Sequence, residues 1–192
     1  DLSAAFDTIR HDILTTRLAD EFGVTSSALS WISSYLNSRK QFIKMGKHSS
    51  APSALDAGVP QGSVLGPLLF TTYTTPICAI IEQSNVSFHQ YADDTCLFTA
   101  LSCDDSPNMI QTLTLCTHKI QQWHRLNFLQ LNPTKSEVII LGSSQQLTKF
   151  NEFTSIDIAG ATLPISSHVK LLGVTLDSHL PFDRHISSTI KA

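Results

Sequence analysis

Two adjacent aspartates, Asp93 and Asp94, interrupt a run of apolar and aromatic residues in FHQYADDTCLF, residues 88–98. Neighbouring carboxylates repel each other and resist burial, so a compensating group is expected nearby. Divalent cations such as Mg²⁺ choose oxygen ligands, and two of them about 3.5 to 4 Å apart can serve phosphoryl transfer. Two ions need a third carboxylate, for which Asp1 and Asp7 are the candidates. The alternative interpretation of the pair is a solvated turn.

A glycine-rich stretch, GVPQGS at residues 58–63, is the second feature with chemical potential. Its glycines permit close approach of the backbone to a flat ligand, and Gln61 offers both a donor and an acceptor. Ser63 can cap the helix that follows, and Asp7 can cap a helix near the start of the chain. An ordinary strand-to-helix turn needs no ligand, so that interpretation also stays open.

The apolar pattern predicts alternating helices and strands that would position these residues. Helices are expected over about 7–22, 25–36, 64–81 with an early interruption at Gly66-Pro67, 106–128, and from 181 onward. Asp1-Leu2 is expected to end a strand, followed by a hairpin around Gly46-Lys47, two short strands around Ala92-Asp93, a strand over 137–141 and a final antiparallel group over about 156–176. The fold class is therefore α+β, with a mostly antiparallel sheet packed against helices.

Length and composition suit one ordinary domain, because 192 residues with 42% hydrophobic content can bury a single core. No stretch has the 18 or more apolar residues of a membrane span, and DLSAAFDTIR is unlike a signal peptide. The cysteines form no CxxC pair and are interpreted as reduced core residues: Cys78, Cys96, Cys103 and Cys116. Core packing is also expected for Trp31 and Trp123. The protein is therefore expected in the nucleus or cytoplasm and not to be secreted.

The formal net charge is -3, from 13 Lys plus Arg and 16 Asp plus Glu. Nucleic-acid-binding proteins usually carry a basic surplus, so this balance counts against a polynucleotide partner. The objection is lifted if carboxylates take part in the chemistry, or if basic segments lie outside these 192 residues.

Five blocks of the sequence resemble, in this order, the reverse transcriptases of non-LTR (LINE-type) retrotransposons. They are DLSAAFD from Asp1, GVPQGSVLGPLLF, YADD at 91–94, LQLNPTKSEVIILG and HVKLLGVTLD. A Tyr-x-Asp-Asp match alone is expected by chance in roughly one chain of this size per hundred. Five ordered blocks over nearly the whole chain are far more specific. The resemblance implies a polymerase palm-like fold, with the right-hand architecture incomplete at both ends. Residues 1–192 would form one domain fragment, a palm with part of the fingers, reaching the thumb connection near 181–192.

The resemblance also implies a catalytic set. Asp1, Asp93 and Asp94 match the metal-binding carboxylates of the polymerase, with Asp93 as the most direct ligand, while Asp7 is left to cap its helix. Lys135 matches a lysine proposed to protonate the leaving pyrophosphate. A solvated loop charge is the alternative for Lys135.

Substrate-binding roles follow in the same way. Phe6 matches the residue beneath the incoming sugar that selects deoxynucleotides, and Ala5 before it keeps the backbone accessible. Gln61 and Gly62 match the loop that contacts the nascent base pair and nucleotide. The hairpin that grips the primer end is matched by Leu171, Leu172 and Gly173. Core packing is the alternative both for Phe6 and for this hairpin.

The implied function is RNA-directed DNA synthesis, with two Mg²⁺ ions, or Mn²⁺ in their place, and transfer from a dNTP to a primer 3′-hydroxyl. The implied partners are an RNA template, a DNA primer and the fingers and thumb segments of the parent polyprotein, without a membrane. Weak or no activity is expected of these residues alone, since a metal ligand at a chain end frays. A catalytically silent retroelement remnant and a two-metal phosphohydrolase or nuclease remain alternatives.

Overall fold

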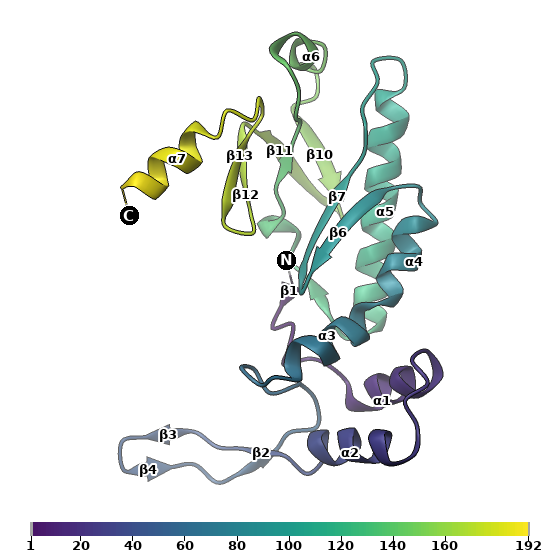
Figure 1. The fold of residues 1–192 in the computed structure, drawn as a ribbon, viewed down its shortest axis with the longest axis vertical. Coiled ribbons are helices and arrows are strands. Elements are labelled where there is room, and N and C mark those ends of the chain that lie inside the picture. Colours follow the sequence, from purple (N-terminus) through teal and green to yellow (C-terminus); the bar gives the residue numbers. More distant parts are fainter. Residues whose placement is uncertain (1, 192) are drawn as a thin grey trace.

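The computed structural model describes residues 2–191, which form helices and short strands around two hydrophobic clusters (Figure 1). The helices are α1 (His11–Asp20), α2 (Ser26–Leu36), α3 (Gly66–Thr74), α4 (Pro76–Glu82), α5 (Ser106–Leu126), the 3₁₀ turn η1 (Pro133–Lys135), α6 (Ser144–Thr148) and α7 (Asp183–Ile190). The strands are β1 (Leu2–Ser3), β2 (Lys40–Gln41), β3 (Lys44–Met45), β4 (His48–Ser49), β5 (Ser53–Ala54), β6 (Ser87–Tyr91), β7 (Asp94–Phe98), β8 (Gln130–Leu131), β9 (Val138–Ile139), β10 (Ser155–Ile158), β11 (Ala161–Ser166), β12 (His168–Leu171) and β13 (Val174–Asp177).

The described strands form six small sheets rather than one continuous sheet. Four are two-stranded antiparallel ladders between strands close in sequence: β2 with β5, β3 with β4, β6 with β7, and β12 with β13. A fifth joins the two distant segments β1 and β8, pairing Leu2 with Leu131. The sixth, β10-β11-β9, is mixed because β9 runs parallel to β11. The expected α+β mixture with mainly antiparallel pairing is therefore present, while this parallel pair was not expected.

The first hydrophobic cluster ties the start of the chain to α1, α2 and α3. Its buried members are Leu2, Ala5, Ile9, Leu14, Leu18, Leu36, Val59, Leu69, Phe70, Tyr73 and Leu129. Leu14 and Leu18 are one helical turn apart, so α1 presents a single apolar face to this cluster. The first sequence block, through Leu2 and Ala5, and the glycine-rich stretch, through Val59, are therefore both anchored in this cluster.

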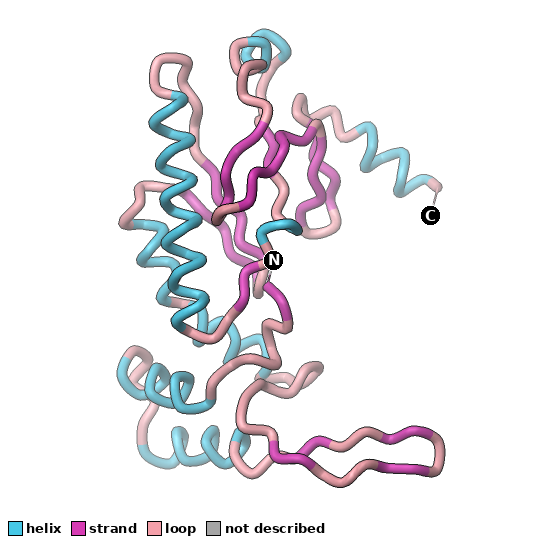
Figure 2. The backbone as a smooth tube through the Cα atoms, turned by 180° about the vertical axis from the view of Figure 1, so that it is seen from behind, coloured by secondary structure: helices cyan, strands magenta, loops and turns pink. Residues whose placement is uncertain are grey.

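The second cluster lies between α4, α5 and the β6–β7 hairpin. It contains Ile77, Ile81, Val86, Cys116 and Ile120, against which Phe88 and Leu97 of the hairpin pack. Seen from behind, α4 and α5 cover one side of this hairpin (Figure 2). Trp123 packs against both clusters, as expected for a core tryptophan, and so joins the two halves of the molecule.

Helix boundaries depart from the sequence expectation at two places. α1 begins at His11, after a turn in which the Asp7 amide donates to the Ala4 carbonyl, so Asp7 does not cap it. The helix expected over 64–81 is two helices, separated at Thr75 before Pro76. Thr75 itself has helical angles, with φ of -47° and ψ of -40°. Proline lacks an amide hydrogen and its ring clashes with the carbonyl four residues earlier, which explains the break. Pro67 by contrast stands in the first turn of α3, where proline is tolerated.

Two further core expectations were wrong. Trp31 is 60% exposed on α2, and Cys103 is exposed in the loop before α5. Cys116 is buried as expected, while Cys78 and Cys96 are half-buried, and all four are free thiols. Within residues 2–191, no helix combines the length and the apolarity needed to cross a bilayer.

Candidate functional site

The two aspartates occupy the tight turn of the β6–β7 hairpin. Tyr91 pairs with Asp94, which leaves Ala92 and Asp93 as the two central residues. Ala92 has a φ of 53° while Asp93 does not lie in the left-handed region, the pattern of a type II′ turn. Asp93 is half-buried and Asp94 exposed, so both carboxylates can reach solvent or a ligand.

Core packing and polar contacts fix this hairpin to the helices. The side chains of Phe88 and Leu97 pack on the second cluster. Gln90 reaches α3 and α4, since its amide nitrogen donates to the Thr74 hydroxyl at 3.4 Å and its carbonyl oxygen accepts from the Cys78 thiol at 3.7 Å. The carboxylates are therefore presented by a strand pair whose own position is determined by the core.

The first sequence block and the glycine loop lie together. The Val59 amide donates to the Phe6 carbonyl at 2.8 Å, and the Gly58 amide donates to the Ile9 carbonyl at 2.8 Å. His11, buried in α1, has its Nε2 2.7 Å from the Gly58 carbonyl. Segments about fifty residues apart are thus fastened by three hydrogen bonds.

Gly58 is required by the closeness of this approach. A Cβ there would meet the Asp7 carbonyl oxygen at 3.0 Å, and the residue has a φ of +92°. Gly62 also has a positive φ, +79°, but a Cβ there would meet nothing within 4 Å. Gln61 and Gly62 are exposed in this loop. The two glycines therefore differ: Gly58 permits contact inside the protein, while Gly62 serves an open surface.

Ser63 stabilises the start of α3. Its hydroxyl donates to the Pro60 carbonyl at 2.7 Å and accepts from the Gly66 amide at 3.0 Å. The residue before the helix is Leu65, so Ser63 lies two residues before the N-cap position at which it was expected. Its hydroxyl nevertheless accepts from the amide of the first helical residue, which has no partner within the helix.

Phe6 lies at the junction of the first block, the glycine loop and α3. Its ring stacks on Phe70 with centroids 4.9 Å apart and an interplanar angle of 25°, and it remains half-buried. A carbon of the ring lies 3.7 Å from the position of a Cβ on Gly66. Phe6 is consequently held on one side by the core and partly open on the other, an arrangement compatible with either a core role or a gate. Ala5 is buried in the first cluster.

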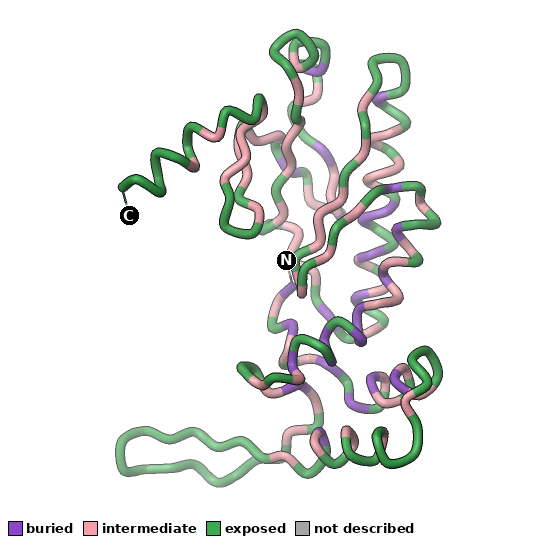
Figure 3. Tube along the Cα trace, in the orientation of Figure 1, coloured by how far each residue is buried: buried purple, intermediate pink, exposed green. Residues whose placement is uncertain are grey.

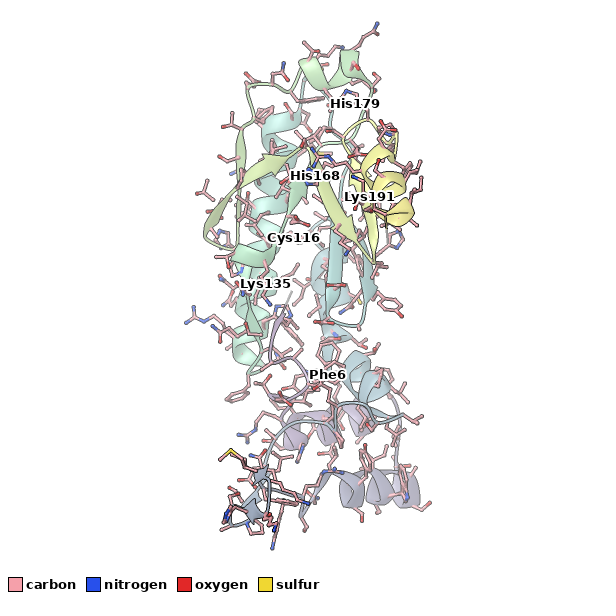
Figure 4. All side chains as sticks on the ribbon, turned by 90° about the vertical axis from the view of Figure 1, so that its left-hand side faces the viewer. Phe6, Cys116, Lys135, His168, His179 and Lys191 are labelled. Carbon is pink, nitrogen blue, oxygen red and sulfur yellow. The ribbon has the colours of Figure 1, made fainter. Side chains whose placement is uncertain are left out.

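Lys135 and the β12–β13 hairpin are presented from other elements. Lys135 ends η1, directly after β8, and is exposed; Figure 4 shows it above Phe6 along the long axis of the molecule. Leu172 and Gly173 form the turn between β12 and β13, with φ values of 47° and 86°. Leu172 is 58% exposed, so this turn is not a plain core strand.

Of the predicted catalytic set, the structure places Asp93 and Asp94 in the turn of the β6–β7 hairpin, whose tip lies at the level of β1 in Figure 1. Asp1 lies outside the described residues, so its convergence with the pair stays a prediction. Among residues 2–191, no group of three His, Cys, Asp or Glu side chains gathers in a metal-binding arrangement. His11 was missed by the sequence reasoning, since one histidine at the start of a helix gives no sign of a partner 47 residues away.

Known proteins resemble this chain over nearly its whole length. The family described as "Reverse transcriptase (RNA-dependent DNA polymerase)" matches residues 1–176. The chain is 30% identical over 199 residues to the probable RNA-directed DNA polymerase from transposon BS of Drosophila melanogaster, covering 100% of this chain and 21% of that protein. It is 27% identical to the RNA-directed DNA polymerase from mobile element jockey of the same species, covering 100% of this chain and 20% of that protein.

This chain belongs to the reverse transcriptase family. The resemblance to the LINE-type enzymes of non-LTR elements is confirmed by these relatives. The chain spans about one fifth of the length of the curated relatives it matches.

Proposed function

We propose that these residues form the catalytic region of an RNA-directed DNA polymerase of a non-LTR retrotransposon. The reaction joins a deoxynucleotide to a primer 3′-hydroxyl, directed by an RNA template. One observation carries the proposal: a chain of this family presents two adjacent carboxylates in a core-anchored hairpin turn. The activity of the whole relatives, whose names state RNA-directed DNA polymerase, is extended to this chain by inference.

Two divalent cations, Mg²⁺ in the first place, fit the donor set offered here. Asp93 and Asp94 supply only carboxylate oxygens, the ligands that such hard cations prefer, and neither carboxylate is fully buried. Asp1 is the proposed third ligand. Bound ions would acidify the primer hydroxyl and neutralise charge on the triphosphate. The role of the protein would then be to hold these oxygens in place, and the anchoring of β6 and β7 supports this role.

The remaining residues would position the substrates. Phe6, supported from below by Phe70, offers one ring face on which a sugar lacking a 2′-hydroxyl would fit. Gln61 and Gly62 are exposed and can approach a base pair without a side-chain obstacle at Gly62. We assign Lys135 to protonation of the leaving pyrophosphate.

The exposed turn at Leu172 and Gly173, with Leu171 before it, is assigned to the primer end. Residues 1–192 would constitute a palm with part of the fingers, reaching the thumb connection near 181–192, in a nuclear or cytoplasmic protein.

A single-turnover primer-extension assay tests the proposal. The chain, in excess over an end-labelled DNA primer on an RNA template, is supplied with dNTPs and Mg²⁺ or Mn²⁺. Slow addition of single nucleotides is expected, abolished by Asp93→Asn. The matched control is Asp104→Asn, because Asp104 and Asp105 form a second adjacent aspartate pair, in the loop before α5. Shortening of the labelled strand instead of extension would support a nuclease, and extension that survives Asp93→Asn would contradict the assignment.

A further inference from the structure

Residues 39–54, which we call the basic arm, differ in charge from the rest of the chain. They carry four of its 13 lysines and arginines, namely Arg39, Lys40, Lys44 and Lys47, and none of its 16 aspartates and glutamates. The acid-free region is longer still, since no Asp or Glu occurs between Glu21 and Asp56. A chain with a net charge of -3 therefore concentrates positive charge in one segment.

The basic arm projects from the body with little support. Its strands pair only within the arm, β2 with β5 and β3 with β4, and the tip is the turn at Gly46-Lys47 (Figure 1). All eight strand residues are exposed, and the arm is coloured as exposed along nearly its whole length in Figure 3. Its large apolar side chains are exposed as well: Phe42 by 59%, Ile43 by 75% and Met45 by 79%. Nothing among the described residues covers this surface.

Trp31 and Tyr35 on α2 form a stack beside Arg39 at the base of the arm, and we call these two rings the aromatic ladder. The rings of Trp31 and Tyr35 stack with centroids 6.0 Å apart and an interplanar angle of 11°. The guanidinium of Arg39 lies over the Tyr35 ring, 5.5 Å from its centroid. Trp31 is 60% exposed and so offers an open π face beside the positive charge.

Positive charge combined with exposed aromatic faces is the chemistry that binds an unpaired polynucleotide. Lysines neutralise phosphates, and aromatic rings stack on bases that are not already stacked in a duplex. A purely apolar partner would gain nothing from the four cationic side chains. In a duplex the bases are already stacked on each other, so an aromatic side chain cannot stack on them. We propose that the basic arm and the aromatic ladder bind single-stranded RNA, the template on its way to the site. This inference rests on the proposed function for the identity of the strand.

The placement of the arm suits such a path. In Figure 1 the basic arm, the loop that contains Gly62 and α7 all project to the same side of the molecule, and in the view turned by 90° this side faces the reader (Figure 4). A strand bound along the arm would therefore approach the glycine loop from the solvent side.

Fluorescence anisotropy with a labelled, unstructured RNA of about 20 nucleotides tests the inference. Binding is measured in EDTA without nucleotides, over a series of salt concentrations. The arm variant carries Lys40→Gln, Lys44→Gln and Lys47→Gln. The matched control carries Lys119→Gln, Lys149→Gln and Lys191→Gln, the same loss of charge from exposed lysines elsewhere. Circular dichroism checks that both variants are folded, as expected for exposed positions.

The arm variant should bind at least about tenfold more weakly, and the slope of log K against log salt should fall by about two, since each lost phosphate contact removes about 0.7. The control should stay within about twofold. Trp31→Leu should weaken binding about tenfold without changing the slope, because stacking releases no counterions. Equal losses in the arm and control variants, or no loss in either, would overturn the inference.

These outcomes are separable from those of primer extension. RNA binding through the arm, together with shortening of the labelled strand or with extension that survives Asp93→Asn, would contradict the proposed function alone. Nucleotide addition with RNA binding indifferent to the arm would contradict this inference alone.

Discussion

The acidic hairpin, β6 and β7, and the basic arm are both antiparallel ribbons closed by two-residue turns, yet they are held in opposite ways. The acidic hairpin packs Phe88 and Leu97 on a hydrophobic cluster and is bonded through Gln90 to α3 and α4. The strands of the basic arm are exposed and pair only with each other. Their charges are opposite too, with adjacent aspartates at one tip and a lysine at the other.

The difference indicates what each ribbon can do. Metal ligands must be held within a few tenths of an ångström, which demands support from a packed core. A surface that follows a flexible polynucleotide gains from adaptable, exposed side chains and loses little by being mobile. The anchoring of each ribbon thus matches the geometry that its proposed ligand requires.

The largest expected effect separates the two aspartate pairs of the chain. Replacing Asp93 and Asp94 by asparagine should weaken Mn²⁺ binding at least about a hundredfold, because both ligands lose their charge. The same replacement at Asp104 and Asp105 should change it less than about threefold. Electron paramagnetic resonance of free Mn²⁺ during titration measures both. Equal losses would mean that adjacency alone, and not the anchored turn, attracts the ion.

The next effect concerns Gly58, which follows β5 of the basic arm and is bonded to the packed part of the protein through Ile9. Gly58→Ala should lower the free energy of unfolding by about 2–4 kcal/mol, since the φ of +92° and the Asp7 backbone at 3.0 Å both oppose a Cβ. Gly62→Ala, with open space around it, should cost only about 1 kcal/mol. Urea denaturation compares the two variants. A cost at Gly62 as large as that at Gly58 would contradict the role of the close approach.

The sequence predicts some parts of this arrangement better than others. Local signals sufficed for both ribbons: alternation and a Gly-Lys turn for the basic arm, and apolar strands around Ala92-Asp93 for the acidic hairpin. Long-range contacts left no such signal. The hydrophobic periodicity does not predict the hydrogen bond between His11 and Gly58 or the parallel pairing of β9 with β11. Trp31 was misplaced because its helical spacing suits a core face, yet the described residues supply no element to cover that face.

Acid should lower the stability of the packed part of the protein, which contains α5, but not that of the basic arm. His124 on α5 is 4% exposed, its buried Nδ1 has no partner among the described residues, and burial lowers the pKa of His124 to about 4. The unfolded chain, with an ordinary histidine pKa near 6.5, then binds more protons than the folded one between these values. Stability is therefore retained above about pH 6.5 and lost as the pH falls toward 4.

The expected loss is about 2 kcal/mol between pH 7 and pH 5. Urea denaturation at the two pH values measures it, and His124→Gln should remove most of the difference. If the unsubstituted protein has the same stability at both pH values, His124 must be hydrated or paired. After correction for the pH dependence of intrinsic exchange, amide protection in the basic arm should show no corresponding change, because its strands pair only with each other.

The smallest effect compares the two turns directly, since both have a positive φ at the first central residue. Gly46 has a φ of 61° with nothing near a Cβ, while Ala92 adopts 53° despite its side chain. Ala92→Gly should therefore relieve strain and raise global stability by about 0.5 kcal/mol, the gain being reduced by the greater freedom of glycine in the unfolded chain. Gly46→Ala should introduce about 1 kcal/mol of strain in the opposite sense.

The two substitutions should also differ in how much of the protein they affect. Because the acidic hairpin is packed on the core, Ala92→Gly should shift the urea midpoint of the whole protein, whereas Gly46→Ala should speed amide exchange only within the basic arm. A shift of the global midpoint by Gly46→Ala would mean that the arm unfolds together with the core. That result would remove the distinction between an anchored acidic ribbon and an independent basic one.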